Sequence, residues 1–221
     1  MTPTVPFTTT LLWALIAFAA GSLPFSLWIG RWLLRADIRA YGDANPGATN
    51  VLRAAGEGRG GKAAFAAAAL LDGFKAAIPV GLAYLWVGID GWPLALVAVA
   101  PVAGHAFSPL LGGHGGKAVA ATFGAWAGLT IWEGPTLLGI GLLLTTRIVR
   151  ANGWAVMGAM IFMLAWLLLT PPAWNGLVTR PAPSVLLLAW LLQMAILIYK
   201  HRADLAKPPL WRNAPTGSSK P

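Results

Sequence analysis

The sequence has 221 residues, of which 57% are hydrophobic and 10% are charged, and its mean hydropathy is +0.66. Soluble domains carry about 25% charged residues, so this composition excludes an ordinary soluble protein and indicates membrane-spanning segments. Cysteine is absent, which excludes disulfides, thiolate catalysis and cysteine-ligated metal sites.

The net charge of +9 has two interpretations, a nucleic-acid partner or the basic cytoplasmic loops of a membrane protein. Nucleic-acid sites combine a basic face with exposed aromatic side chains, and the sequence has no such pattern. We therefore attribute the charge to membrane topology and expect no nucleic-acid partner.

Seven apolar segments follow one another along the chain, and they predict an all-α integral membrane protein with about seven transmembrane helices. Their expected bounds are 10–33, interrupted by Gly21-Ser22-Leu23-Pro24, then 63–88, 92–111, 118–132, 135–146, 154–170 and 184–199. Several are shorter than the roughly 20 residues that span a bilayer, so a re-entrant piece is an alternative for one of them. The first segment lacks the basic start and the cleavage site of a signal peptide, so we interpret it as an anchor.

The positive charges orient these predicted helices. Placing the amino terminus outside puts 14 of the 16 Lys and Arg residues on the cytoplasmic side, as the positive-inside rule requires. The two exceptions are Lys75, within the second apolar segment, and Arg180, on the outer side. The carboxyl terminus is then cytoplasmic. We predict one transmembrane domain over residues 1–206, with its site in the cytoplasmic loops, and a flexible cytoplasmic tail over 207–221.

The first predicted cytoplasmic loop contains GDANPGATNVLR at residues 42–53. Gly, Asn and Pro favour tight turns that expose backbone N–H groups. Such groups, together with Asn and Thr side chains, form concavities that hold phosphate oxygens, and Arg53 adds a group suited to binding phosphate through two hydrogen bonds. A plain turn between helices is the alternative interpretation.

A second loop reads GGHGGK at residues 112–117, immediately before the fourth apolar segment. Glycines followed by Lys at a helix amino terminus favour anion binding, because free N–H groups and the helix dipole both attract negative charge. The alternative is a flexible loop with one topology-fixing Lys. We favour the anion site, because four clustered glycines cost conformational entropy unless the backbone must approach a ligand.

Two further groups of polar residues stand out. Lys200-His201-Arg202 ends the last apolar segment, where a His beside two cations serves as an acid/base or anion ligand; anchoring to lipid headgroups is the alternative. Asp72 and Lys75 lie one helical turn apart in an apolar run, where lone charges are costly. We expect them to pair or to face a polar cavity.

Two other site types are not expected. Residues 56–62, GEGRGGK, have the spacing of a nucleotide-binding P-loop, but Ala63 replaces its Ser or Thr and no strand precedes it. The three His and seven acidic residues are scattered, without the spacing of metal ligands. We therefore expect no metal and no other cofactor.

The motifs resemble those of the bacterial acyl-phosphate-dependent glycerol-3-phosphate acyltransferases. The resemblance covers roughly residues 10–205 and rests on GSLPFS at 21–26, NPGATNVLR at 45–53, Asp72 with Lys75, GHAF at 104–107, GGK at 115–117 and His201-Arg202. It implies a multi-pass protein of the bacterial cell (inner) membrane with seven spans and its amino terminus outside. The implied reaction transfers an acyl group from acyl phosphate to the sn-1 hydroxyl of glycerol 3-phosphate, giving lysophosphatidic acid for phospholipid synthesis.

The resemblance also implies the site residues. Catalytic roles fall on Lys117, His201 and Asn45, and substrate binding on Asp43, Gly47, Thr49, Asn50, Arg53, Gly115, Gly116 and Asp204. The implied partners are acyl phosphate, glycerol 3-phosphate and membrane lipids, with the chain acting as a monomer. Because acyl phosphate is already activated, holding two phosphates in the right geometry supplies much of the rate, and cations and N–H donors stabilise the developing charge.

The chain departs from the usual pattern of that family at several positions. Asp43-Ala44 stands where Ser-Gly is usual, His114 and Ala118 replace Lys and Gly, Asp204 replaces Asn, and residues 147–153 lack a Ser-rich turn. These changes leave open a divergent paralogue with another phosphorylated acceptor, or a non-catalytic lipid-phosphate binder. A small transporter is less favoured, because the sequence shows neither an internal repeat nor a charge deep in the membrane core.

Overall fold

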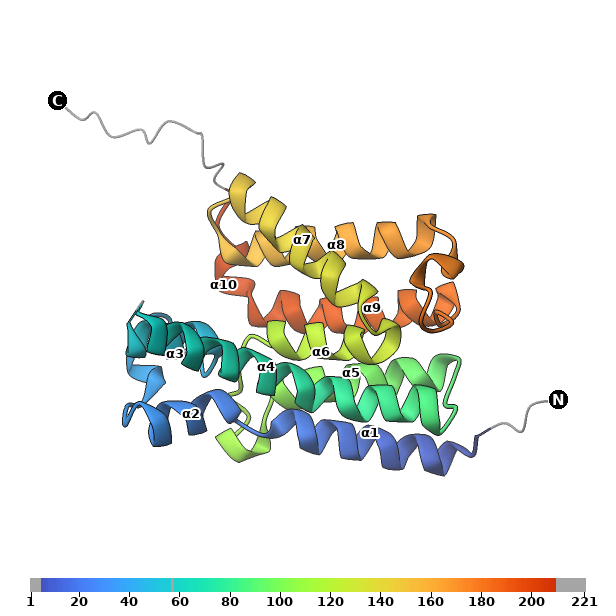
Figure 1. The fold of residues 1–221 in the computed structure, drawn as a ribbon, viewed down its shortest axis with the longest axis horizontal. Helices are drawn as coiled ribbons and strands as arrows, with labels where there is room; N and C mark the ends of the chain where they lie inside the picture. Colours follow the sequence, from blue (N-terminus) through green and yellow to red (C-terminus); the bar gives the residue numbers. More distant parts are fainter. Residues whose placement is uncertain (1–4, 57, 210–221) are drawn as a thin grey trace.

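The computed structural model describes residues 5–56 and 58–209, and over this part of the chain it is all-helical (Figure 1). The long helices are α1 (Phe7–Ser22), α4 (Arg59–Gly81), α5 (Trp92–Ala106), α6 (Val119–Thr130), α7 (Glu133–Ile148), α8 (Asn152–Leu169) and α9 (Pro183–Lys200). The short ones are α2 (Phe25–Leu33), α3 (Ala48–Ala55) and α10 (Arg202–Leu205), with single turns at η1 (Ile38–Ala40), η2 (Leu82–Trp86), η3 (Pro109–Leu111) and η4 (Pro172–Asn175). The predicted all-α class is confirmed.

Five segments are long and apolar enough to cross a membrane. They are Phe7–Leu33, Arg59–Trp86, Trp92–Leu111, Asn152–Leu169 and Pro183–Lys200. The other two predicted segments also form helices, but α6 has 12 residues and α7 has 16, which is short for a span. Large apolar side chains such as Leu15 and Leu169 face outward, as hydrocarbon-facing residues do.

The interruption predicted in the first apolar segment is present. α1 ends at Ser22 and α2 begins at Phe25, because Pro24 lacks the N–H that a continuous helix needs. Gly21 lies against α5, and a Cβ there would collide with the backbone of Pro101. Small residues thus let the helices pack closely at this point, as is usual in membrane bundles.

The same principle joins α4 to α6. A Cβ at Gly124 would collide with the Gly73 carbonyl group, and Gly128 lies against the side chain of Val80. Close backbone approach fixes α6 against α4 and buries Trp126 completely. This packing determines which face of α6 remains free to line the site described below.

One local prediction is wrong. Residues 42–53 were expected to form a turn-rich loop, but residues 48–53 belong to α3, so the loop part of this motif is confined to residues 42–47. Val51 is fully buried on α3 and packs in a small cluster with Ile38 and Leu27. Gly56, with a φ of 77°, ends the helix. The tertiary contact of one apolar residue therefore overrides the turn propensity of its neighbours.

The bundle has two distinct ends (Figure 1). α3 and α10 lie at one end, called the α3 end, whereas η4 and the α8–α9 connection lie at the other, called the η4 end. Most of the predicted tail, 207–221, lies outside the described residues. Within the described part, the Lys207 carbonyl accepts a hydrogen bond of 2.9 Å from Trp154 Nε1.

Candidate active site

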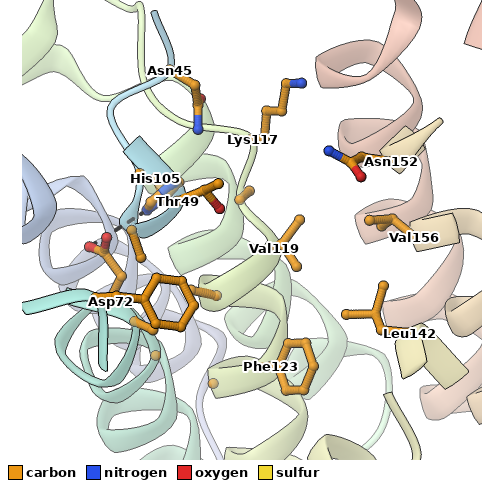
Figure 2. Close-up of a pocket in the computed structure, with 18 of the residues that line it drawn as sticks. Asn45, Thr49, Asp72, His105, Lys117, Val119, Phe123, Leu142, Asn152 and Val156 are labelled. Carbon is orange, nitrogen blue, oxygen red and sulfur yellow. Dashed lines mark ion pairs between the residues drawn. The ribbon is translucent and has the colours of Figure 1, made fainter. Parts of the chain in front are cut away.

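A cavity of about 760 Å³ lies at the α3 end, between α4 on one side and α7 and α8 on the other, with α6 as its floor. Its apolar lining includes Phe65, Leu70, Phe74, Phe123, Leu142 and Val156. Its polar lining consists of Asp43, Asn45, Thr49, Arg53, Asp72, His105, Lys117, Thr146, Asn152 and His201. Figure 2 shows Asn45, Lys117 and Asn152 around the upper rim, with Phe123 and Leu142 below them. The cavity is therefore amphipathic, polar at the mouth and apolar further in.

Lys117 is the central cation of the mouth. Its Nζ lies 2.9 Å from Asp43 Oδ2 and 3.3 Å from Asp204 Oδ2, and its side chain is 27% exposed. It thereby bridges the first loop and α10, which are 161 positions apart in the sequence, counted from Asp43 to Asp204. The predicted site residues of three separate loops therefore meet at one ammonium group.

The segment that carries Lys117 is held rigidly on α5. The Gly116 N–H donates to the His105 carbonyl over 3.0 Å, and Lys200 Nζ donates to the carbonyls of Ala106 and Gly115, each over 2.9 Å. These bonds determine where the Lys117 side chain starts and keep it at the cavity mouth.

Gly115 and Gly116 were predicted to bind substrate through their backbone amides, and neither lines the cavity. A Cβ at Gly115 would collide with the His105 carbonyl oxygen, and one at Gly116 would collide with the His105 ring. The Gly116 N–H already has a partner, so it is not free for a phosphate oxygen. Both glycines pack closely against α5, and Lys117 is the predicted residue of this loop that lines the cavity.

Asn50 organises the first loop. Its Nδ2 donates to Asp43 Oδ1 over 3.1 Å and to the Asn45 carbonyl over 2.9 Å, while its Oδ1 accepts from Arg53 Nη1 over 2.9 Å. Asn50 is buried and does not line the cavity. It was predicted as a substrate ligand, but here it positions Asp43, Asn45 and Arg53, which do line it. Gly47, also predicted, caps α3 and lines the cavity as well.

The charges of Asp43 and Lys117 stabilise each other. Partial burial by itself would raise the pKa of Asp43, but the hydrogen bond and charge of Lys117, with hydrogen bonds from Asn45 and Asn50, outweigh burial and lower it. Burial would likewise lower the pKa of Lys117, but Asp43 and Asp204 raise it. Both groups are therefore charged at neutral pH.

His201 lies at the start of α10 and lines the cavity. Its Nδ1 is 2.9 Å from the Leu197 carbonyl, and because a carbonyl only accepts, Nδ1 carries the proton. Burial, together with the charge of Lys117, lowers the pKa of His201. The imidazole is therefore neutral, with Nε2 as its acceptor.

Four polar residues that line the cavity were not predicted as site residues, namely Asp72, His105, Thr146 and Asn152. The expected pairing of Asp72 with Lys75 is confirmed at 2.7 Å, and Ser26 Oγ donates to the same carboxylate. The sequence feature that pointed to Asp72 and Lys75 was the presence of charged residues in an apolar segment. Asn152 lies in the segment 147–153, which lacks the Ser-rich turn usual in the family, so no motif pointed to it.

The fold and the cavity together define an integral membrane protein that binds a molecule with both a phosphate-like head and an apolar tail. The cationic, amide-bearing rim matches the head, and the apolar lining over α6 matches the tail.

Comparison with known proteins gives the family. A family model described as glycerol-3-phosphate acyltransferase matches residues 11–208. Glycerol-3-phosphate acyltransferase 1 of Thermotoga maritima is 34% identical over 202 residues, covering 87% of this chain and 94% of that relative. The namesake from Deinococcus radiodurans is 36% identical over 201 residues, covering 90% and 91%.

Solved structures agree. The glycerol 3-phosphate form of PlsY (YgiH), an integral membrane glycerol 3-phosphate acyltransferase, superimposes with a TM-score of 0.72 at 29% identity, covering 90% of each chain. Its lysophosphatidic acid form gives a TM-score of 0.72 at 27% identity, again over 90% of each chain. The chain belongs to the glycerol-3-phosphate acyltransferase family, and its activity is the transfer of an acyl group to glycerol 3-phosphate, as the motifs predicted.

Proposed function

We propose that the enzyme takes its acyl group from acyl phosphate and places it on the sn-1 hydroxyl of glycerol 3-phosphate, releasing inorganic phosphate and lysophosphatidic acid. The observation that carries this proposal is that one cavity is lined both by the cations Lys117 and Arg53 and by apolar side chains such as Phe123 and Leu142. Both substrates are phosphorylated at one end, and the donor and product also carry an acyl chain. A single amphipathic cavity accommodates all of these features.

The apolar part suits the acyl chain. Leu70 and Phe74 of α4 line the cavity and are 57% and 53% exposed, so its wall is open on the side of the bundle. In a membrane this side faces hydrocarbon, which gives a lipid-like donor a direct route in. Burial of apolar chain surface contributes about 25 cal/mol per Å² to binding.

The polar part suits the reaction. Attack by the acceptor hydroxyl on the acyl carbon places negative charge first on the tetrahedral intermediate and then on the leaving phosphate. Lys117 and Arg53 stabilise that charge, while Asn45 and Thr49 orient the phosphate oxygens by hydrogen bonding. Neutral His201, through Nε2, accepts a hydrogen bond from the attacking hydroxyl and orients it. The bond between the acyl carbon and the phosphate oxygen then breaks, and the leaving phosphate takes up the proton that the hydroxyl loses.

The same proposal includes the place of the protein in the cell. We assign it to a bacterial cell membrane, as one domain over residues 1–206 with seven spans and an external amino terminus. Arg180, the exception to the positive-inside rule, is buried and paired with Glu133, so its charge does not oppose this orientation. We also assign it as a monomer in a bilayer of phospholipid.

The test is acyl transfer by purified protein in lipid, with palmitoyl phosphate and glycerol 3-phosphate as substrates. Removing one well-placed charge-stabilising donor typically lowers kcat about 100- to 1000-fold, and we expect this loss for Lys117→Ala. Lys207→Ala, which removes a cation from beyond α10 outside the cavity, is the matched control. Product is measured as radiolabelled lysophosphatidic acid.

Equal activity in Lys117→Ala and Lys207→Ala would refute the assigned role of Lys117. No turnover by folded wild-type protein with acyl phosphate would refute the donor assignment. Turnover with another phosphorylated acceptor, but not with glycerol 3-phosphate, would favour the divergent-paralogue interpretation.

A further inference from the structure

The mouth of the cavity contains a carboxylate where an anionic substrate would bind. Asp43 Oδ2 lies 2.9 Å from Lys117 Nζ, which is the distance of a charge-assisted hydrogen bond. Its other oxygen, Oδ1, accepts from Asn50 over 3.1 Å and lies 3.8 Å from Arg53 Nη1. One carboxylate thus takes up donors from both basic loops.

Asp204 contributes a second carboxylate. Its Oδ2 lies 3.3 Å from the same ammonium group, so Lys117 is held between two anions. Asp43 and Asp204 have side chains that are 44% and 31% exposed. Neither carboxylate is buried in the core.

The neighbouring cations Lys200 and Arg202 have other partners and do not compete with Lys117 for Asp43 and Asp204. Lys200 donates to the carbonyls of Ala106 and Gly115. Arg202 donates to the Tyr199 carbonyl and lies over the Tyr199 ring, 4.5 Å from its centroid. Among the residues that the structure describes, Lys117 and Arg53 are the Lys and Arg side chains that line the cavity, and the two carboxylates offset their charge.

We propose that Asp43, assisted by Asp204, sets the affinity of the enzyme for its phosphorylated acceptor by occupying Lys117 until the acceptor phosphate displaces it. The inference rests on the proposed function, since it concerns the phosphate site of that reaction. A phosphate dianion gains the full charge of Lys117 only by displacing Asp43 from it, and otherwise it binds beside a like charge. The consequence is a raised KM for the acceptor, with little effect on the chemical step.

The experiment compares Asp43→Asn, Asp43→Ser and Asp204→Asn with wild type. The asparagine variants remove only charge, and the serine variant also removes bulk. We expect the KM for glycerol 3-phosphate to fall about fivefold in both Asp43 variants and about twofold in Asp204→Asn, with kcat nearly unchanged, because a half-exposed ion pair has a modest strength. Asp37→Asn is the matched control. The Asp37 carboxylate lies in the same connection between α2 and α3, but it pairs with Arg39 outside the cavity. The KM of this variant for glycerol 3-phosphate is expected to match that of wild type.

Calorimetric binding of glycerol 3-phosphate, without donor, separates this inference from the proposed function. Tighter binding by Asp43→Asn supports the inference even if acyl phosphate proves to be the wrong donor. In a Lys117→Ala background the Asp43→Asn substitution is expected to change the dissociation constant by less than about twofold, since the shared partner is gone. An unchanged or raised KM in both Asp43 variants, or an equal gain in the Lys117→Ala background, would overturn the inference.

Discussion

The two ends of the bundle each hold an ionic cluster, and the clusters differ in how completely their groups are paired. At the η4 end, Arg180 donates from Nε to Glu133 over 2.8 Å, from Nη1 to the carbonyls of Leu167 and Thr170, and from Nη2 to Glu133 and the Thr170 hydroxyl. These bonds use all five guanidinium N–H groups, and the Arg180 and Glu133 side chains are 1% and 2% exposed. At the α3 end, Lys117 is 27% exposed and shares two carboxylates.

The contrast separates a structural ion pair from a functional one. A fully paired, buried guanidinium has no donor left for a substrate, and removing either partner leaves an uncompensated charge. A partly exposed ammonium shared between two partly exposed carboxylates forms ion pairs of modest strength. The degree of pairing and burial, rather than the residue types, distinguishes the two roles.

The largest expected effect comes from breaking the η4 cluster. Arg180→Met leaves the Glu133 carboxylate buried without its cation, and such losses destabilise proteins by about 3–5 kcal/mol. We expect the Tm in detergent to fall by roughly 10 °C, given about 2–4 °C per kcal/mol for a chain of this size. Tryptophan fluorescence during heating measures it, and kcat below the transition is expected to stay at the wild-type value.

A double variant sharpens the comparison. Glu133→Leu with Arg180→Met replaces the pair by apolar groups and is expected to recover most of the lost Tm. Lys117→Ala, by contrast, is expected to leave Tm nearly unchanged while abolishing most activity. A Tm loss in Lys117→Ala as large as that in Arg180→Met would contradict the division into structural and functional clusters.

A smaller effect concerns backbone strain at the α3 end. Ala44 and Ala118 adopt φ values of 57° and 63°, and each follows one of the paired ions, Asp43 or Lys117. Because the left-handed region disfavours Ala and suits Gly, Ala44→Gly and Ala118→Gly are each expected to stabilise the protein by about 0.5–1 kcal/mol.

The matched control is Ala66→Gly, at an exposed position within α4, which is expected to destabilise by about 1 kcal/mol. Thermal unfolding of the three variants under the same conditions shows whether each substitution raises or lowers the stability. Destabilisation by all three would show that the left-handed conformation carries no strain.

The smallest expected effect is the pH dependence contributed by His201. Burial lowers its pKa below the ordinary value of 6.5, so the unfolded state binds the proton more readily than the folded state. This contribution to stability is complete above pH 6.5 and is lost as pH falls from 6.5 toward the lowered folded-state pKa. His201→Asn is expected to flatten the curve of Tm against pH in this window. A curve with the wild-type slope would assign the pH dependence to other groups.

Much of the fold follows from residue patterns that act locally. Apolar runs predicted every long helix, and Gly21 with Pro24 predicted the break between α1 and α2. The spacing of Asp72 and Lys75 predicted their pairing, because a helix brings residues three apart onto one face. α3 was missed, since its stability comes from packing Val51 against residues distant in sequence.

The site divides in the same way. The motifs identified Lys117, Asn45, Thr49, Arg53 and His201, all of which line the cavity. Asn152 was not predicted, and the Gly116 N–H, expected to be free, donates to the His105 carbonyl. Whether an N–H is free depends on what packs against it, and this is a tertiary property.

By itself, the sequence determined the membrane class, the helical segments and the chemical identity of the polar loops, because hydropathy, helix periodicity and side-chain chemistry act locally. Only the tertiary structure decided that Lys117 meets Asp43 and Asp204, that Arg180 is saturated by Glu133 and its neighbours, and that α6 forms the floor of one cavity. These contacts join residues tens of positions or more apart, and their geometry is set by how glycine-lined helices pack. The physical reason is that charge pairing depends on distance and burial, and both arise only when the helices come together.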